Sequence, residues 1–183
     1  MCNLSEILCG SRTGPAHSMF RESARMRTNS KSASPTLFLD FDGALHPNGA
    51  QVEDYFCRVD FLALTIAEFD LNVVISSSWR CHHSFKRLLE YFPEPFRGKI
   101  SGVTGDAYIG RNSRWKELQK YIRVHGNNNW RALDDSSFEF PPECPELILC
   151  DGARGVQERD LTTLRRWLAA EIPPCPSHSF PGS

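Results

Sequence analysis

The sequence predicts an α/β fold, a three-layer Rossmann-like arrangement in which helices cover both faces of a parallel sheet. Two features predict it. Short apolar runs alternate with segments of helical periodicity between residues 35 and 172. Three of these runs also end in an acid or a hydroxyl, at Asp40, Ser76 and Asp134. Because functional groups of open parallel sheets gather at the carboxyl ends of the strands, this coincidence favours a site there.

Composition indicates one soluble domain, expected at residues 35–172 and in the cytoplasm. The 183 residues carry a formal net charge of −1, which does not suit a protein held on nucleic acid by bulk charge. No apolar run approaches the length of a membrane span, so we expect no membrane contact. The seven cysteines are scattered and odd in number, as in reduced intracellular proteins.

The two ends of the chain lack hydrophobic periodicity. Residues 1–34 are rich in serine and arginine, which predicts a disordered basic tail; contact with an acidic partner is the alternative. Residues 173–183 contain four prolines and are expected to form a loose tail.

Five segments have the composition of buried strands, and four have the periodicity of amphipathic helices. The predicted strands are 36–40, 71–75, 99–103, 130–133 and 146–150. The predicted helices are 58–69, 80–92, 113–124 and 161–171. Pro93 ends the second helix, Gly126 follows the third, and Asp160 can cap the last.

The first candidate motif is Asp40-Phe41-Asp42-Gly43, directly after the first strand. Carboxylates two residues apart can face the same cleft while the residue between them faces the core. Asp40 could then attack phosphorus and form an aspartyl-phosphate, and Asp42 could act as general acid and base. Gly43 would permit a sharp turn beside the substrate. An ordinary Asx-type turn at a strand end is the alternative.

A second motif, Ser76-Ser77-Ser78-Trp79-Arg80, follows the second strand. A hydroxyl from Ser76 or Ser77 could donate to a phosphate oxygen, and Arg80 could contact the substrate. A serine N-cap on the following helix is the alternative, and both interpretations can hold together.

A third motif, Asp134-Asp135, follows the fourth strand. Adjacent acids near other carboxylates need compensation, and Mg²⁺ would supply it through oxygen ligands. A turn before Ser136 is the alternative. The run 81–83, Cys-His-His, lacks a second ligand cluster and favours the first turn of a helix over a metal site.

A cation should balance the charge on a transferring phosphoryl group. Arg114 and Lys116, at the start of the third helix, are the candidates, and Arg114 is preferred. A solvated helix face is the alternative.

The order of these motifs resembles the haloacid-dehalogenase-like (HAD) superfamily over residues 35–171. The segments 39–47, 77–80 and 130–135 resemble one branch of it, the small phosphatase-like domain of Swiss-army-knife RNA-repair proteins. The resemblance implies that Asp40 is nucleophile and Mg²⁺ ligand, and that Asp42 is acid/base and gives its backbone carbonyl to the metal. It also implies that Ser76 holds the phosphate and that Asp134 completes the metal site with Asp135 in support.

Superfamily members often carry a cap domain over the site, but here only about 30 residues separate the first motif from the second strand. We therefore expect no sizeable cap and an open site that suits a large phosphorylated substrate, such as an RNA or DNA terminus. A basic and aromatic track could assist: Trp79, Arg80, His82, Arg111, Arg114 and Trp115. The alternatives are a phosphatase of proteins or small metabolites, and a catalytically idle interaction domain. The oligomeric state stays open.

Overall fold

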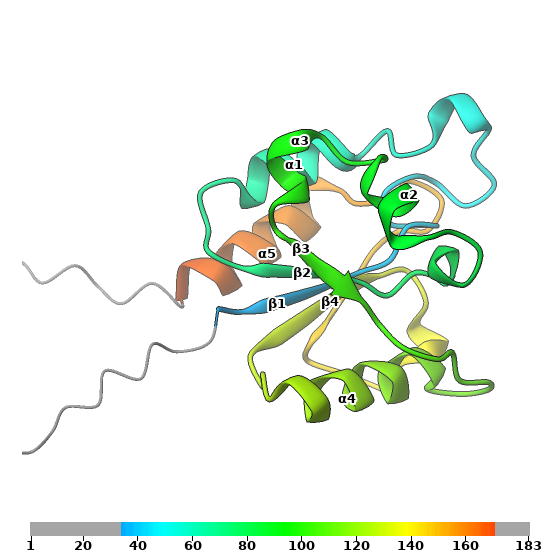
Figure 1. The fold of residues 1–183 in the computed structure, drawn as a ribbon, viewed down its shortest axis with the longest axis vertical. Coiled ribbons are helices and arrows are strands. Elements are labelled where there is room, and N and C mark those ends of the chain that lie inside the picture. The colour runs from blue at the N-terminus through cyan, green and yellow to red at the C-terminus, as the bar shows by residue number, and fades with distance from the viewer. Residues whose placement is uncertain (1–33, 171–183) are drawn as a thin grey trace, which may run out of the picture. The chain divides into compact units, whose positions relative to one another are not determined.

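The computed structural model describes residues 34–170. Residues 1–33 and 171–183 lie outside this range, so the expectations for the two tails stay predictions. The remainder is an α/β domain built on one five-stranded sheet, which confirms the predicted fold class (Figure 1).

All five strands are parallel and lie in the order β3-β2-β1-β4-β5. Their bounds are β1 Thr36–Leu39, β2 Asn72–Ile75, β3 Ile100–Val103, β4 Trp130–Asp134 and β5 Leu147–Leu149. Strand β1 is therefore central, and its last residue, Leu39, pairs with Ile75 on one side and Leu133 on the other. The register brings the residues that follow β1 and β2 to the same level as the end of β4.

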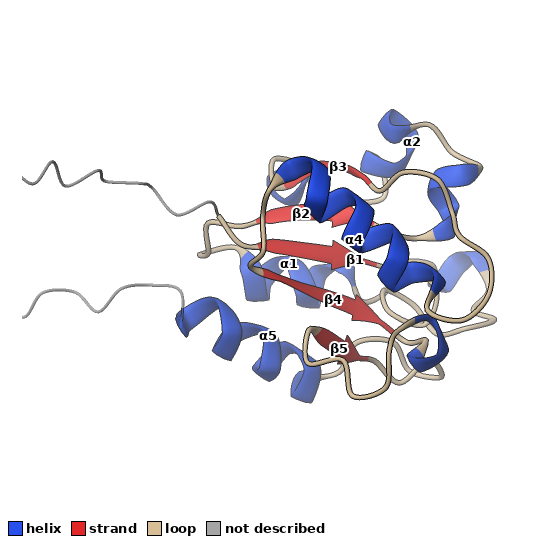
Figure 2. Cartoon of the chain, turned by 90° about the horizontal axis from the view of Figure 1, so that it is seen from below, coloured by secondary structure: helices blue, strands red, loops and turns tan. Residues whose placement is uncertain are grey.

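Helices cover both faces of the sheet (Figure 2). On one face lie α1 (Val59–Ile66), α2 (Phe85–Leu89), α3 (Glu94–Arg97) and α5 (Glu158–Ala170), around a core of alternate strand residues such as Leu37, Leu39 and Val73. On the other face lies α4 (Ser113–His125), which packs Leu118 and Ile122 against Phe38 and Val74. This alternation of inward residues is the strand period expected when both faces are buried.

The predicted helix over residues 80–92 is wrong as one continuous element. The chain instead forms a 3₁₀ helix, η2 (Ser78–Cys81), and then α2. The side chains of Ser77 and Ser84 each accept a backbone N–H two or three residues later, so each serine begins its own short helix. His82 and His83 lie in the turn between them, outside any first helical turn.

No sizeable cap domain is present within residues 34–170. Between Asp42 and β2 the chain forms only η1 (Val52–Asp54) and α1, and between β2 and β3 it forms only η2, α2 and α3. Within the described residues, only these short elements and their loops surround the carboxyl ends of the strands. A search of the described residues finds no helix with the length and hydropathy required to span a membrane.

Candidate active site

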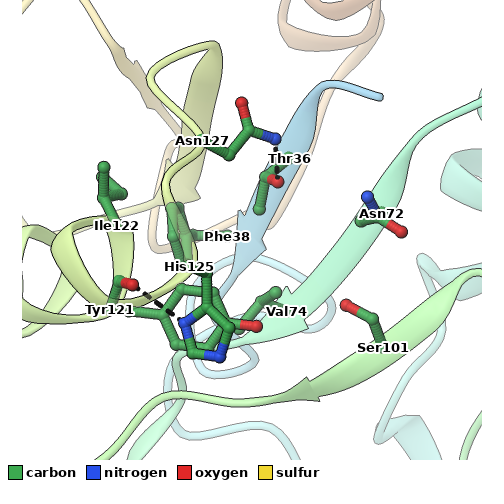
Figure 3. A pocket seen from close by; sticks show the side chains of 9 residues that line it. All are labelled: Thr36, Phe38, Asn72, Val74, Ser101, Tyr121, Ile122, His125 and Asn127. Carbon is green, nitrogen blue, oxygen red and sulfur yellow. Dashed lines mark hydrogen bonds between the residues drawn. The ribbon is translucent and has the colours of Figure 1, made fainter. Parts of the chain in front are cut away.

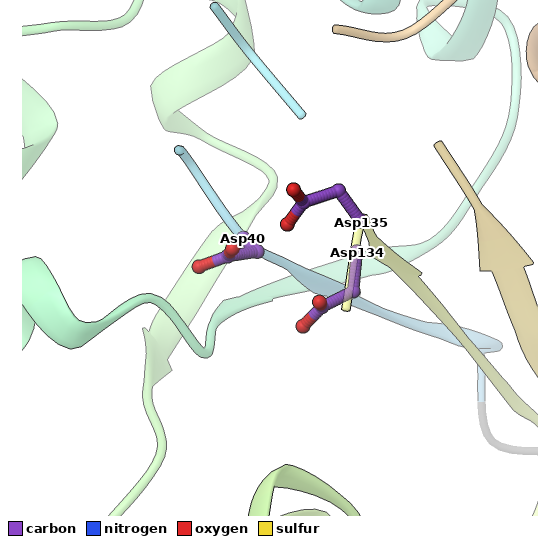
Figure 4. Close-up of side chains that lie close together, drawn as sticks. All are labelled: Asp40, Asp134 and Asp135. Atoms are coloured by element: carbon purple, nitrogen blue, oxygen red, sulfur yellow. The ribbon is translucent and has the colours of Figure 1, made fainter. Parts of the chain in front are cut away.

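Three carboxylates lie together at the carboxyl ends of β1 and β4 (Figure 4). One oxygen from each of Asp40, Asp134 and Asp135 lies within 4.8 Å of the other two. Asp40 and Asp134 are buried, and Asp135 is partly exposed. The sheet topology makes this cluster, since β1 and β4 are adjacent and the Asp40 N–H donates to the Leu133 carbonyl at 3.1 Å.

Glycines on two loops make room for the Asp135 carboxylate. A Cβ built on Gly43 or on Gly152 would overlap that carboxylate, so a side chain at either position would displace it. Gly43 also has φ +69°, a conformation that favours glycine. Asn48 also contacts this carboxylate, since its Nδ2 donates to Asp135 Oδ2 at 2.6 Å. The predicted turn at Gly43 therefore lies directly against the Asp135 carboxylate.

Arg114 lies at the base of the cluster and contacts both buried acids. Its Nη2 is 3.4 Å from Asp40 Oδ1, and its Nε is 3.3 Å from Asp134 Oδ2. Further ion pairs join it to Glu117 at 3.8 Å and to Glu139 at 3.6 Å. Lys116, the other candidate cation, is exposed on α4 beside Tyr108 and Trp115. The geometry brings Arg114 and not Lys116 to the acids.

Burial raises the pKa of both inner carboxyl groups. The pKa of Asp40 is raised to about 6, chiefly by desolvation, which the charge of Arg114 and a hydrogen bond from Ser77 partly offset. The pKa of Asp134 is raised to about 8 by desolvation and by the charge of Asp40, against the opposing effect of Arg114. Burial alone would lower the pKa of the Arg114 guanidinium, but the surrounding acids raise it, so this cation stays charged.

The residues of the site fit a divalent metal ion of the Mg²⁺ type. Five carboxylates surround two guanidinium groups, those of Arg80 and Arg114. Asp134 Oδ2 is buried and accepts no hydrogen bond, although Arg114 Nε lies 3.3 Å away in an ion pair. A hard cation with oxygen ligands would balance the excess of carboxylates and give this oxygen a ligand bond.

We expect the metal-free protein to lose stability as pH rises. Carboxyl groups with raised pKa bind more protons in the folded state than in the unfolded state, so the free energy of unfolding decreases as pH rises from about 4 to about 8. Mg²⁺ needs the deprotonated ligands. Saturating Mg²⁺ should therefore raise the melting temperature by about 5 °C at pH 8 and by much less at pH 5.5. Differential scanning fluorimetry against EDTA measures this.

The Asp134→Asn variant is the control for this experiment. It removes one proposed ligand and should abolish most of the Mg²⁺-dependent shift while the protein remains folded. An equal shift at both pH values, or a shift that survives in Asp134→Asn, would contradict the proposed ligand set.

Two serines lie beside Asp40 at the end of β2. Ser76 is buried. Its N–H donates to the Leu39 carbonyl at 2.9 Å, which brings it to the same level of the sheet as Asp40. The side chain of Ser77 hydrogen-bonds Asp40 and also caps η2 through the Trp79 N–H. The cap interpretation and the phosphate interpretation thus concern neighbouring serines, and each can hold.

Arg80 occupies a different place from the substrate contact expected for it. Its Nη2 is 2.6 Å from Glu117, its Nη1 donates to the Ser76 and Ser77 carbonyls, and its Nε donates to the Gly105 carbonyl. Glu117 in turn accepts a hydrogen bond from the Thr104 hydroxyl. Sequence reasoning missed Glu117, which joins both arginines. Arg80 therefore holds the β2 loop in place.

Asp42 lies outside the three-acid cluster, and its side chain is about half exposed. Trp79 Nε1 donates to its Oδ2 at 2.8 Å, and His46 Nε2 lies 3.1 Å from its Oδ1. Sequence reasoning named neither residue as a partner, although His46 and Trp79 both stand in the quoted motifs. The Asp42 side chain is therefore not one of the carboxylates that the cluster brings together.

One cavity away from the three acids offers fewer groups for catalysis. This cavity of about 330 Å³ lies on the α4 face, near the amino ends of β1 and β2, and includes Thr36, Asn72, Ser101 and His125 (Figure 3). It has no carboxylate in its lining, and His125 Nδ1 donates to the Tyr121 carbonyl of its own helix at 2.9 Å. The candidate site therefore stays at the carboxyl ends of the strands.

The chain is similar to one described family. The model of the family described as "HAD domain in Swiss Army Knife RNA repair proteins" matches residues 36–161, which include every strand and every site residue discussed above. No curated protein and no solved structure matches the chain in the corresponding comparisons. With this match over most of its length and the expected α/β sheet, the chain belongs to the HAD domain family of Swiss Army Knife RNA repair proteins and is a HAD-type hydrolase domain.

Proposed function

We propose that this protein is a Mg²⁺-dependent phosphatase that hydrolyses a phosphate monoester through an aspartyl-phosphate on Asp40. The observation that carries the proposal is the cluster of Asp40, Asp134 and Asp135 at the carboxyl ends of the strands of a HAD-type sheet, in which the two buried acids, Asp40 and Asp134, are ion-paired with Arg114. Buried acids of like charge lower the stability of the fold unless a cation compensates them. A catalytically idle interaction domain would bear this cost without using the cluster.

In the proposed reaction, an Asp40 carboxylate oxygen attacks phosphorus and the bond from phosphorus to the leaving oxygen breaks. Asp42 gives its proton to that leaving oxygen and later takes a proton from the water that hydrolyses the aspartyl-phosphate. Ser76 holds a phosphate oxygen, and Arg114 balances charge behind Asp40. Asp40, Asp134 and Asp135 would hold Mg²⁺ with the Asp42 backbone carbonyl, and the ion would neutralise phosphate charge.

The substrate we favour is a large one with a terminal phosphate, such as an RNA or DNA end. The absence of a sizeable cap among the described residues supports this choice, since a large substrate can cover the site itself. A long nucleic-acid track has less support. Arg80 and Arg114 are held in buried ion pairs, and of the expected track only His82 and Arg111 are exposed. We therefore propose that the protein contacts mainly the terminal nucleotide of such a substrate. We also propose that it acts in the cytoplasm.

A substrate panel tests the proposal. The full chain should hydrolyse p-nitrophenyl phosphate only with Mg²⁺, and should hydrolyse 3′- or 5′-phosphorylated oligonucleotides with a higher kcat/KM than phosphopeptides or small sugar phosphates. Phosphate release measured with and without EDTA gives the result.

Preference for phosphopeptides or small metabolites would move the assignment to a phosphatase of those substrates. Absence of turnover with every phosphate ester, in a protein that is folded and binds Mg²⁺, would overturn the enzymatic proposal and favour an interaction domain.

A further inference from the structure

The carboxylate of Asp42 is held at both of its oxygens. Trp79 Nε1–H donates to Oδ2 at 2.8 Å, and His46 Nε2 is hydrogen-bonded to Oδ1 at 3.1 Å. An aspartate side chain on a loop normally samples several rotamers. Here two contacts from different segments of the chain select one of them, while half of the side-chain surface stays open to solvent.

Both partners of Asp42 are themselves fixed by packing. The Trp79 ring lies edge-on to the rings of Phe41 and Phe56, with centroids 5.9 Å and 5.4 Å away. The His46 ring is 1% exposed and packs against Tyr55 and Phe56. Neither ring can turn without disturbing this aromatic cluster, so the two contacts define a fixed position for the carboxylate.

The second nitrogen of His46 gives an independent indication. Nδ1 is buried and has no hydrogen-bond partner, so the polar contact that His46 makes through its ring is the one with Asp42. A histidine in an apolar cluster is otherwise costly, and an apolar residue would pack there at lower cost. The polarity of this ring is therefore explained by Asp42.

We propose that Trp79 and His46 are positioning residues that hold Asp42 in the orientation from which it donates its proton to the leaving oxygen. The inference rests on the proposed phosphatase activity and specifies which residues place its general acid. A displacement of about 1 Å at such a group can lower the rate about 10²-fold. Loss of the Trp79 and His46 contacts should therefore lower the rate most for substrates whose leaving group must be protonated.

The test compares two phosphate esters that differ in how much they need an acid. Nitrophenolate leaves readily without a proton, whereas the more basic phenolate of phenyl phosphate depends on one. In Trp79→Phe, which keeps an aromatic ring and removes the N–H, kcat/KM for phenyl phosphate should fall about 10-fold more than kcat/KM for p-nitrophenyl phosphate. A substitution that only disturbs the packing would lower kcat/KM for the two esters by the same factor.

His46 allows a rescue experiment within the same assay. His46→Leu should reproduce the selective loss on phenyl phosphate, and His46→Gln, which retains a side-chain N–H, should recover part of it. Tyr91→Phe is the matched control, because Tyr91 packs in the same cluster against Phe56 and Trp79 and has no contact with the Asp42 carboxylate. Its ratio between the two esters should equal that of the wild type.

A measurement without turnover tests the geometry directly. The indole N–H resonance of Trp79 in a ¹⁵N-labelled protein should move when Asp42 is replaced in Asp42→Leu, while the indole resonance of Trp167 should not. Equal losses on both esters, or an unmoved Trp79 resonance, overturns the positioning role even if wild type is active. An inactive wild type with the expected resonance shift overturns the proposed function instead.

Discussion

Replacement of Asp40 by asparagine is expected to abolish phosphatase activity and leave the fold intact. Asparagine keeps the shape of the side chain but cannot form an acyl phosphate, so kcat for p-nitrophenyl phosphate should fall at least about 10³-fold. The same change removes a buried carboxylate whose pKa is raised to about 6 by desolvation. At pH 8 in EDTA, the variant should therefore melt at the same temperature as the wild type or higher.

This pairing of a lost activity with a retained or higher melting temperature separates chemistry from unfolding. Asp106→Asn is the control, since Asp106 is almost fully exposed, pairs with Lys120 at the surface and lies outside the three-acid cluster. It should change neither quantity. Residual activity within about 10-fold of the wild type in Asp40→Asn would exclude Asp40 as the nucleophile.

Replacement of Arg114 by methionine should lower both stability and activity. Arg114 is the buried cation that contacts Asp40 and Asp134, and its loss leaves these two buried acids without their ion-pair partner, whereas Glu117 keeps Arg80. Breaking a buried pair in this way costs about 3–5 kcal/mol of unfolding free energy. Urea denaturation in EDTA at pH 7 measures this cost. With Mg²⁺ present, kcat should also fall about 10²-fold, because a charge behind the phosphoryl group is lost.

Lys116→Met is the matched variant, two positions further along α4. Lys116 is exposed, so its replacement should change the unfolding free energy by less than about 0.5 kcal/mol and leave kcat unchanged. Similar effects of the two substitutions would contradict the assignment of the site cation to Arg114.

The strands and the meeting of the acids could be predicted from the sequence. A buried strand is a short apolar run, and Asp40 and Asp134 mark the ends of two such runs. Parallel topology then brings strand ends to one edge of the sheet. The residue types and the parallel topology are therefore enough to predict that Asp40 and Asp134 lie together.

The contacts of Arg80 and Asp42 could not be predicted in this way. A guanidinium can reach a phosphate or a buried acid equally well, and the choice of Glu117 depends on how α4 packs. The hydrogen bond from Trp79 to Asp42 joins residues 37 positions apart. Trp79 lies in the short 3₁₀ helix η2, which a search for α-helical periodicity does not predict. Side-chain partners across a fold depend on packing, which local pattern does not contain.

The central place of β1 has a consequence for how the protein folds. Asp40 and Arg114 are 74 residues apart, and β2 and β3 lie between β1 and its neighbour β4 in the chain. Assembly of such a sheet is slow, because distant segments must meet before their contacts can help. A cation that needs both strand ends would arrive after this step. It would lengthen the lifetime of the native state without hastening its formation.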